Sequence, residues 1–241
     1  MKETFISWTE CTWNPVTGCS KISAGCKNCY AEKIANELQA KGNKRYEDGF
    51  CVRIHPDLLD FPYKMKAGKE IFVNSMSDLF HKNVPLEFIK KVFRVMNDNP
   101  QHVFQILTKR PERLLECDHE LRWCKNIWMG VSVENEAVKE RIDLLRLCNA
   151  KVKFLSIAPL LGPLNNLNLE GIDWVIVGGE KADNPRPMKE EWVLDIQKQC
   201  KEQNVHFYFK QWGGRNRDGG CLLKGKEYKA KPEYELPFFG F

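Results

Sequence analysis

Short apolar segments alternate with amphipathic segments through the central part of the chain, and this alternation restricts the fold more than any other feature. Seven segments are apolar and rich in β-branched or aromatic residues, and they lie at 51–55, 70–76, 102–108, 126–133, 152–157, 174–179 and 206–212. Their apolar residues are nearly continuous, as is typical of parallel strands that are covered on both faces. A further short strand is predicted just ahead of Cys19.

Helical periodicity separates most of these predicted strands. Apolar residues recur at helical spacing after the first cysteines, after Pro85, after Asn135 and ahead of the last strand. The four sets are Tyr30, Ile34 and Leu38; Phe88, Val92, Val95 and Met96; Val138, Ile142 and Leu145; and Trp192, Ile196 and Cys200. Strands that alternate with helices predict a parallel α/β fold.

A chain of 241 residues is of the size that one α/β barrel uses. We expect a single-domain full or partial (β/α) barrel over residues 1–212, with the cysteines in the loop after the first strand. An open doubly wound sheet is the competing arrangement, and periodicity does not separate the two. Residues 213–241 change to glycines, lysines and aromatic residues, so we expect an irregular C-terminal extension that packs on the barrel.

Polar residues follow nearly every predicted strand directly. Functional residues of parallel α/β folds gather at the carboxyl ends of the strands, so we expect these side chains to line a pocket. A polar residue at a single strand end is also expected wherever a strand reaches solvent. The prediction of a pocket therefore depends on the whole set of polar residues. The set is Asn74, Ser75, Ser77, Asp78, Thr108, Lys109, Arg110, Ser132, Glu134, Ser156, Gly178, Gly179, Glu180, Lys210 and Gln211.

Cys19, Cys26 and Cys29 stand close together, directly before a predicted helix, with the spacing C-x6-C-x2-C. The C-x2-C half is a common metal-binding spacing. The sequence starts with the polar segment MKETFISWTE and has no apolar run near the roughly 18 residues of a membrane span, so we expect a cytoplasmic protein without a membrane partner. In that reducing compartment, grouped cysteines bind metals or act in catalysis.

The cysteine motif has three interpretations. A structural zinc site needs a fourth ligand, and the first histidine, His55, lies 26 residues beyond Cys29. An iron–sulfur cluster held by three thiolates explains the number of cysteines, because one iron is then open to a substrate or cofactor. Free thiols that lie together by chance are the third interpretation.

Three cysteines after the first strand of a parallel barrel resemble the radical S-adenosylmethionine superfamily, whose usual motif is C-x3-C-x2-C. Further segments resemble a family of phage and prophage proteins with a three-cysteine motif, which is distantly similar to spore photoproduct lyase. These segments are TWNPVTGCSKISAGCKNCYAEKIA, FVNSMSDLFH, LTKRPERL, GVSVEN, PLLGPL, DWVIVGGE and FKQWG. The first gap of six residues, instead of three, is a departure from the superfamily motif.

The resemblance implies a [4Fe-4S] cluster on Cys19, Cys26 and Cys29, S-adenosylmethionine as a second cofactor and an external electron donor. The reduced cluster would cleave the sulfonium C–S bond, and the resulting 5′-deoxyadenosyl radical would abstract a hydrogen atom from the substrate. The cofactor-binding candidates are Asn74, Ser75, Asp78, Lys109, Arg110, Ser132 and Glu134, in which Lys109 or Arg110 would bind the carboxylate and Ser132 or Glu134 the ribose. The remaining pocket candidates are Tyr30, Ser156, Ala158, Glu180 and Lys210, and Ala158 stands where the resembling family usually has a glutamate.

A net charge of +5 permits a nucleic-acid partner without requiring one. Basic residues of the last strand and the extension are interleaved with Trp212, Tyr228 and Tyr234, as on many nucleic-acid-binding surfaces, although an ordinary solvated surface has the same composition. These basic residues are Lys210, Arg215, Arg217, Lys224, Lys226, Lys229 and Lys231. The sequence thus predicts a radical enzyme that modifies or repairs a nucleic-acid base or nucleotide. The alternative is a non-catalytic zinc or iron–sulfur module of a nucleic-acid-associated phage or prophage system.

Overall fold

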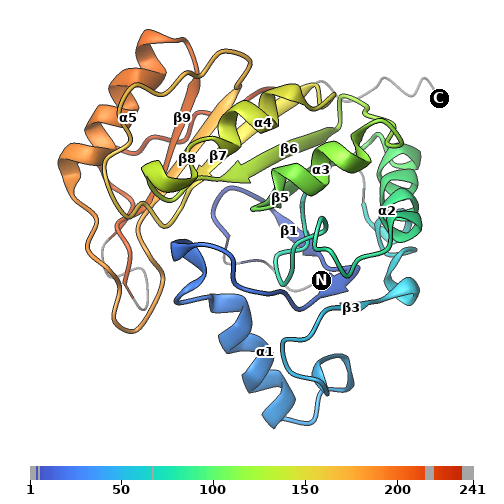
Figure 1. Ribbon diagram of the computed structural model, residues 1–241. Coiled ribbons are helices and arrows are strands. Elements are labelled where there is room, and N and C mark those ends of the chain that lie inside the picture. Colours follow the sequence, from blue (N-terminus) through green and yellow to red (C-terminus); the bar gives the residue numbers. More distant parts are fainter. Residues whose placement is uncertain (1–3, 5, 67, 215–219, 235–241) are drawn as a thin grey trace.

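Seven parallel strands form the central sheet of the computed structural model, which describes residues 4, 6–66, 68–214 and 220–234. The sheet order is β1-β4-β5-β6-β7-β8-β9, so each strand lies beside the preceding one of the sheet. The sheet therefore winds in one direction and curls into a half-barrel with edges β1 and β9 (Figure 1). The expected partial barrel is confirmed, and the doubly wound alternative is wrong. The strands are β1 (Cys11–Trp13), β4 (Glu70–Val73), β5 (Val103–Thr108), β6 (Ile127–Ser132), β7 (Val152–Ile157), β8 (Trp174–Gly178) and β9 (His206–Gln211).

The segment 51–55 does not join this sheet, so its prediction as a parallel strand is wrong. Only β3 (Arg53–Ile54) is extended there, and it pairs antiparallel with β2 (Val16–Thr17) in a separate two-stranded sheet. Both residues of β3 are only half-buried, which is too little burial for a central parallel strand. The strand predicted just ahead of Cys19 is β2, whereas the main sheet begins with β1, which the sequence reasoning missed.

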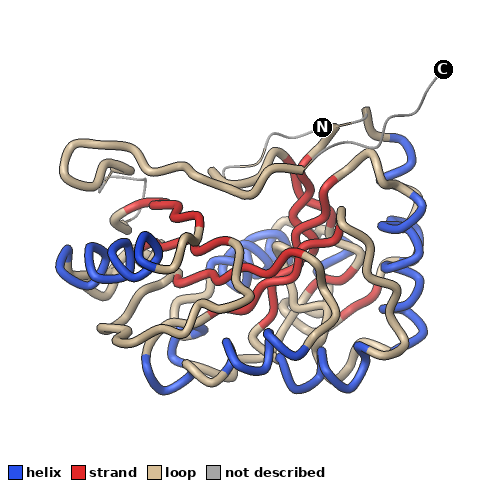
Figure 2. Tube along the Cα trace, turned by 90° about the horizontal axis from the view of Figure 1, so that it is seen from above, coloured by secondary structure: helices blue, strands red, loops and turns tan. Residues whose placement is uncertain are grey.

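In the described residues, five α-helices connect these strands, and Figure 2 shows most of them along the outer side of the curved sheet. They are α1 (Tyr30–Ala40), α2 (Leu86–Asp98), α3 (Pro111–Asp118), α4 (Arg141–Leu147) and α5 (Glu190–Glu202). The short 3₁₀ helices are η1 (Ala24–Cys26), η2 (Lys44–Tyr46), η3 (Pro56–Leu58), η4 (Pro62–Lys64) and η5 (Glu136–Val138). In the part of the chain that the structure describes, no helix is both long and apolar enough to cross a membrane.

Two helical predictions need correction. The Asn135 side chain caps η5 by accepting a hydrogen bond from Ala137 N at 3.1 Å, and α4 begins only at Arg141. In α1, which lies apart from the sheet at the bottom of Figure 1, the buried residues are alanines, because this helix packs against a small separate cluster. Tyr30 and Ile34, expected inside, are 43% and 39% exposed.

The two faces of the sheet bury different side chains. Aliphatic residues on the convex face pack against the helices, and aromatic residues fill the concave face. On the concave face of β6 and β7, alternate residues change from the aromatic Trp128 and Phe154 to Ser132 and Ser156 toward the carboxyl ends. The half-barrel therefore has an aromatic floor and a polar rim.

The described part of the C-terminal extension, residues 213–214 and 220–234, runs from the cavity wall along β9 to the amino ends of the strands. Phe209 N donates to Tyr228 O at 2.8 Å, which protects the exposed edge of β9. Trp174 Nε1, at the start of β8, donates to Ala230 O at 2.8 Å, and Tyr234 Oη donates to Pro100 O at 2.9 Å. Ala230 and Tyr234 thus lie at the end of the half-barrel opposite the polar rim, whereas Gly213 and Gly214 line the cavity at the rim.

The lysines of the extension are mostly paired with carboxylates. Ion pairs join Lys224 to Glu190, Lys229 to Glu227 and Lys231 to Glu70. Arg215 and Arg217, which the sequence analysis grouped with these lysines, lie outside the described residues. The described lysines therefore favour an ordinary solvated surface over a nucleic-acid interface.

Candidate functional site

A cavity of about 460 Å³ opens at the carboxyl ends of the strands. It is lined by all three clustered cysteines and by residues from the ends of β4 to β9. The sequence-predicted residues in its wall are Cys19, Cys26, Cys29, Tyr30, Asn74, Ser75, Ser77, Asp78, Thr108, Lys109, Arg110, Ser132, Ser156, Ala158, Gly179, Glu180, Lys210 and Gln211. Glu134 is absent from this wall and lies behind the cysteine loop, by which we mean residues 18–29.

Asp78 anchors the site from the end of β4 and has little free capacity to bind a cofactor. Its Oδ1 accepts hydrogen bonds from Phe80 N at 3.0 Å and from Thr108 Oγ1 at 2.7 Å. Its Oδ2 accepts from Lys109 N at 3.2 Å and from Arg110 Nη1 at 2.8 Å. The carboxylate is 5% exposed and holds the segment after β5 against the segment after β4.

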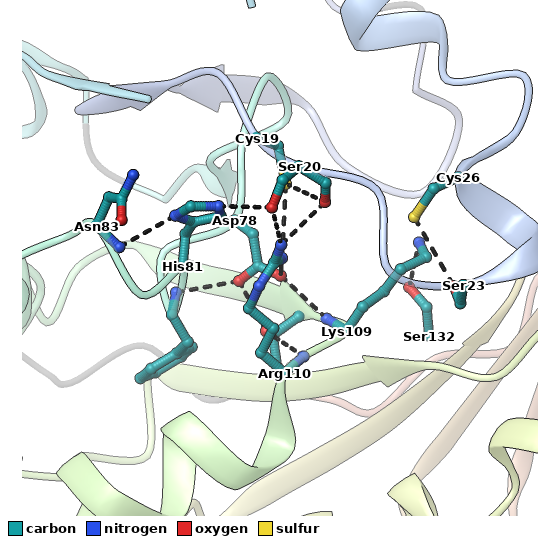
Figure 3. A network of polar contacts seen from close by, with 12 residues as sticks. Cys19, Ser20, Ser23, Cys26, Asp78, His81, Asn83, Lys109, Arg110 and Ser132 are labelled. Carbon is teal, nitrogen blue, oxygen red and sulfur yellow. Dashed lines mark hydrogen bonds and ion pairs between the residues drawn. The ribbon is translucent and has the colours of Figure 1, made fainter. Parts of the chain in front are cut away.

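Arg110 connects this anchor to the cysteine loop, as Figure 3 shows. Its Nη1 lies 3.5 Å from Cys19 Sγ, and its Nη2 donates to Ser20 O at 2.9 Å. Burial and the nearby Asp78 raise the pKa of Cys19, and Arg110 opposes this rise. A metal-bound thiolate at Cys19 would therefore gain a charge-assisted hydrogen bond from Arg110.

His81 supports the same part of the loop. Its Nδ1 accepts a hydrogen bond from Asn83 N at 3.1 Å, so the neutral ring carries its proton on Nε2. Nε2 lies 2.8 Å from Ser20 Oγ and donates to it (Figure 3). Sequence reasoning missed this histidine, although it closes the FVNSMSDLFH segment.

Lys109 and Ser132 lie next to each other near Cys26 (Figure 3). Lys109 Nζ donates to Ser132 Oγ at 3.2 Å, and no carboxylate among the described residues pairs with this ammonium group. Burial opposes ionisation of Cys26, but a hydrogen bond from the Ile22 backbone and the positive charge of Lys109 lower its pKa overall. Lys109 is therefore free to bind an anion within the cavity.

Glu134 fastens the middle of the cysteine loop. Its Oε1 accepts from Gly25 N at 3.2 Å and from Ser23 Oγ, and its Oε2 accepts from Arg141 Nη1 at 2.9 Å. The Glu134 and Arg141 side chains are 1% and 6% exposed. This geometry leaves Glu134 poorly placed to bind a ribose, the function for which it was an alternative to Ser132.

Glu180 fastens the end of the loop between Cys26 and Cys29. Its Oε2 accepts from Asn28 Nδ2 at 2.8 Å and from Arg186 Nε at 3.0 Å, and Arg186 Nη1 reaches Ala24 O at 3.0 Å. Burial opposes ionisation of Glu180, but Arg186 and Asn28 lower its pKa overall. Arg186 and Asn28 were missed because loop residues without periodicity give no sequence signal of their partners.

Asn74 leaves one donor unused at the cavity. Its Oδ1 accepts from Val16 N at 3.2 Å, but its buried Nδ2 has no hydrogen-bond partner in the described structure. The residue is 2% exposed and has the left-handed backbone angle φ of 62°. A buried amide without a partner is costly, so Nδ2 is suited to a ligand acceptor. Beside it, Tyr30 Oη donates to Ser75 O at 2.6 Å.

The thiols share the cavity without surrounding one point. Within the described ranges, no group of three His, Cys, Asp or Glu side chains is arranged to hold a single metal ion. Zinc bound at about 2.3 Å would require such convergence. Iron–sulfur clusters are held by cysteine thiolates, and the three cysteines line the same cavity as the orphaned Asn74 amide. The donor set therefore fits an iron–sulfur cluster.

Solved structures with a similar fold include those of spore photoproduct lyase. A mutant of the lyase with a cysteine replaced by serine has a TM-score of 0.50 and 15% identity, over 74% of this chain and 58% of the lyase chain. A mutant of the lyase with bound AdoMet and dinucleoside spore photoproduct has a TM-score of 0.45 and 11% identity, over 79% and 61% of the two chains. This chain thus spans about 58% of the length of the first lyase chain, and the likeness concerns the fold.

No curated protein matches the sequence. A family model described as "Protein of unknown function (DUF5131)" matches residues 3–234, which is nearly the whole sequence. This chain therefore belongs to the DUF5131 family.

Proposed function

We propose that this chain is a radical S-adenosylmethionine enzyme. The observation that carries the proposal is that Cys19, Cys26 and Cys29 line the same cavity as Lys109 and Ser132. A purely structural cluster needs no cofactor-sized cavity beside it, whereas an enzyme does. The fold likeness to spore photoproduct lyase supports the same class.

In this proposal Cys19, Cys26 and Cys29 hold a [4Fe-4S] cluster, and one iron stays open for the second cofactor. When bound and reduced, the cluster supplies the electron that splits the sulfonium C–S bond of S-adenosylmethionine and yields the 5′-deoxyadenosyl radical. An external electron donor has to reduce the cluster.

The residues of the cavity wall bind and orient S-adenosylmethionine. Lys109 binds its carboxylate, because its ammonium group has only the Ser132 hydroxyl as a partner. Arg110 is less suited to this function, because Asp78 and Ser20 already occupy its guanidinium group. The Ser132 hydroxyl forms a hydrogen bond with a ribose hydroxyl, as donor or as acceptor. Asn74 Nδ2 donates a hydrogen bond to a further acceptor of the cofactor.

The proposed substrate is a nucleic-acid base or a nucleotide. Support comes from the aromatic and apolar side chains in the cavity wall, among which Tyr30 and Ile34 are 43% and 39% exposed. Exposed aromatic rings in a cavity are suitable for stacking on a planar base. The lysines of the C-terminal extension add nothing to this argument, because Lys224, Lys229 and Lys231 are paired with carboxylates.

Anaerobic reconstitution with iron and sulfide tests the proposal. We expect about four iron atoms per chain and, after reduction in the presence of S-adenosylmethionine, formation of 5′-deoxyadenosine measured by liquid chromatography. Cys29→Ser should abolish both signals. Cys51→Ser is the matched control, because Cys51 is an exposed thiol outside the cavity wall.

Uptake of one zinc ion without iron would contradict the proposal and favour the non-catalytic module. Iron uptake without 5′-deoxyadenosine would contradict the enzyme while leaving an iron–sulfur module. The phage or prophage setting of such a module stays a prediction.

A further inference from the structure

Lys210 extends into the cavity from the concave face of β9. It stands two residues beyond Tyr208, a residue of the aromatic floor, at the register shift where Val177 pairs with Phe209 and Gly178 pairs with Gln211. Gly178 of β8 leaves room beside it, since a Cβ on Gly178 would lie only 3.2 Å from Lys210 Cβ. The Lys210 ammonium group forms no hydrogen bond or ion pair with any described residue.

Lys181 is a second cation in the wall of the same cavity, directly after β8. The carboxylates that could neutralise the two lysines are already engaged. Glu180 is bound by Arg186 and Asn28, and Asp78 is bound by Arg110. Burial and the charge of Lys181 lower the pKa of Lys210 to about 8. Two lysines therefore face the cavity without a counter-ion from the described residues.

These two lysines are separate from the part of the cavity assigned to S-adenosylmethionine. Lys109 follows β5, and Lys210 lies on β9, four strand positions further along the sheet. At about 4.8 Å per strand, this separation is roughly 19 Å along the curved sheet. One molecule of S-adenosylmethionine bound by its carboxylate at Lys109 leaves the Lys210 end of the cavity to the substrate.

We propose that Lys210 and Lys181 form an anion-binding subsite for the substrate, which therefore carries a phosphate or carboxylate group. An anion between the two ammonium groups removes their mutual repulsion and supplies the missing counter-ion. The inference rests on the proposed function only in assigning this end of the cavity to the substrate. The binding of an anion by the two lysines can be measured without any radical reaction.

Anion titrations followed by NMR test the subsite on the full chain with isotope-labelled lysine, before and after cluster reconstitution. The Lys210 signal is assigned by its loss in Lys210→Met. We expect inorganic phosphate or acetate to raise the pKa of Lys210 by about one unit, which corresponds to about tenfold tighter binding to the protonated form. Affinity should therefore fall as the pH rises above about 8, the pKa of Lys210 without the anion. A response to phosphate alone assigns a phosphate ester, and a response to acetate alone assigns a carboxylate.

Lys210→Met and Lys181→Met should each weaken phosphate or acetate binding about tenfold. Lys198→Met is the matched control, because this lysine of α5 is 71% exposed and paired only with Glu202 at 3.8 Å. A Lys210 pKa that neither anion moves, or equal weakening by Lys198→Met, would overturn the subsite. Formation of 5′-deoxyadenosine without anion binding would overturn the subsite but leave the proposed function intact. Anion binding without 5′-deoxyadenosine would overturn the proposed function but leave the subsite intact.

Discussion

The Glu134 carboxylate lies so close to Gly25 that a side chain at this position of the cysteine loop would force one of the two to move. Glu134 Oε1 accepts the Gly25 amide at 3.2 Å, and a Cβ on Gly25 would lie 2.4 Å from the same oxygen. The carboxylate is itself held by Arg141 at 2.9 Å, so it cannot move away without breaking a buried ion pair. The end of β6 thereby fixes the position of the loop that carries the three thiols.

Gly25→Ala should displace the cysteine loop while leaving the sheet intact. The added methyl group overlaps the Glu134 carboxylate, and the loop is the less constrained partner. We expect at least half of the iron uptake to be lost, with a change in unfolding free energy of about 1–3 kcal/mol. Iron analysis after reconstitution and urea denaturation measure the two effects.

Gly162→Ala is the control for this substitution, because the nearest atom to a Cβ there is Asn135 Cβ at 3.9 Å. Full iron uptake by Gly25→Ala would show that contact with Glu134 does not set the position of the thiols.

Asp78→Asn should destabilise the protein strongly. The change leaves the Arg110 guanidinium without its carboxylate partner, and the side chains of the pair are only 7% and 12% exposed. Breaking a buried pair by removing one partner costs about 3–5 kcal/mol. Urea denaturation measures the loss, and Glu116→Gln is the control, because the Arg113–Glu116 pair is exposed and should change stability by less than about 1 kcal/mol. Similar losses in both variants would contradict the anchoring function of Asp78.

Ala158→Glu should change the reaction, because residue 158 lines the cavity directly after β7. A carboxylate there would face a cavity in which Lys109, Lys181 and Lys210 have no carboxylate partner among the described residues. We expect a higher rate of 5′-deoxyadenosine formation or a changed KM for S-adenosylmethionine. Ala158→Gln is the isosteric control and should leave both unchanged. Equal kinetics for wild type and Ala158→Glu would mean that a charge at this position has no function.

Most of the fold could be predicted from the sequence because parallel strands have a simple signature. Six of the seven predicted strands lie in the sheet, since nearly continuous apolar runs need burial on both faces. The segment 51–55 has the same β-branched character but is covered too little to join the sheet. The buried face of α1 was predicted wrongly. Its larger apolar residues, Tyr30 and Ile34, line a cavity, whereas its alanines form the face that packs against the protein.

The residues of the candidate site could be predicted as a set, but their individual functions could not. Carboxyl ends of parallel strands converge on one rim, and this rule brought Lys109, Ser132 and Lys210 to one cavity. The same rule does not distinguish residues that face a ligand from those that hold a loop. Glu134 and Glu180 hold the cysteine loop through Gly25 and Asn28, and these contacts join residues more than 100 positions apart in the sequence.

Lys210→Met should stabilise the protein at neutral pH and change how its stability depends on pH. The pKa of Lys210 is about 8 in the folded chain, against a usual value of 10.5. Between these two pH values the unfolded chain keeps a proton that the folded chain has lost, so the free energy of unfolding rises with pH in this window. Below pH 8 the folded protein bears the full cost of the buried charge.

We therefore expect the variant to exceed the wild type at pH 7 by about 1–3 kcal/mol, a figure reduced for the partial exposure of the side chain. This advantage should shrink as the pH rises from 8 toward 10.5, the window set by the folded and usual pKa values. Urea denaturation of both proteins across this pH range measures the difference between their free energies of unfolding. All other titratable groups are common to both proteins, so their contributions cancel in this difference. Saturating phosphate should reduce the advantage at pH 7, because the anion binds the wild type about tenfold more tightly than the variant and therefore stabilises the wild type more. An advantage that is constant with pH would mean that Lys210 carries no buried charge and that the methionine improves packing alone.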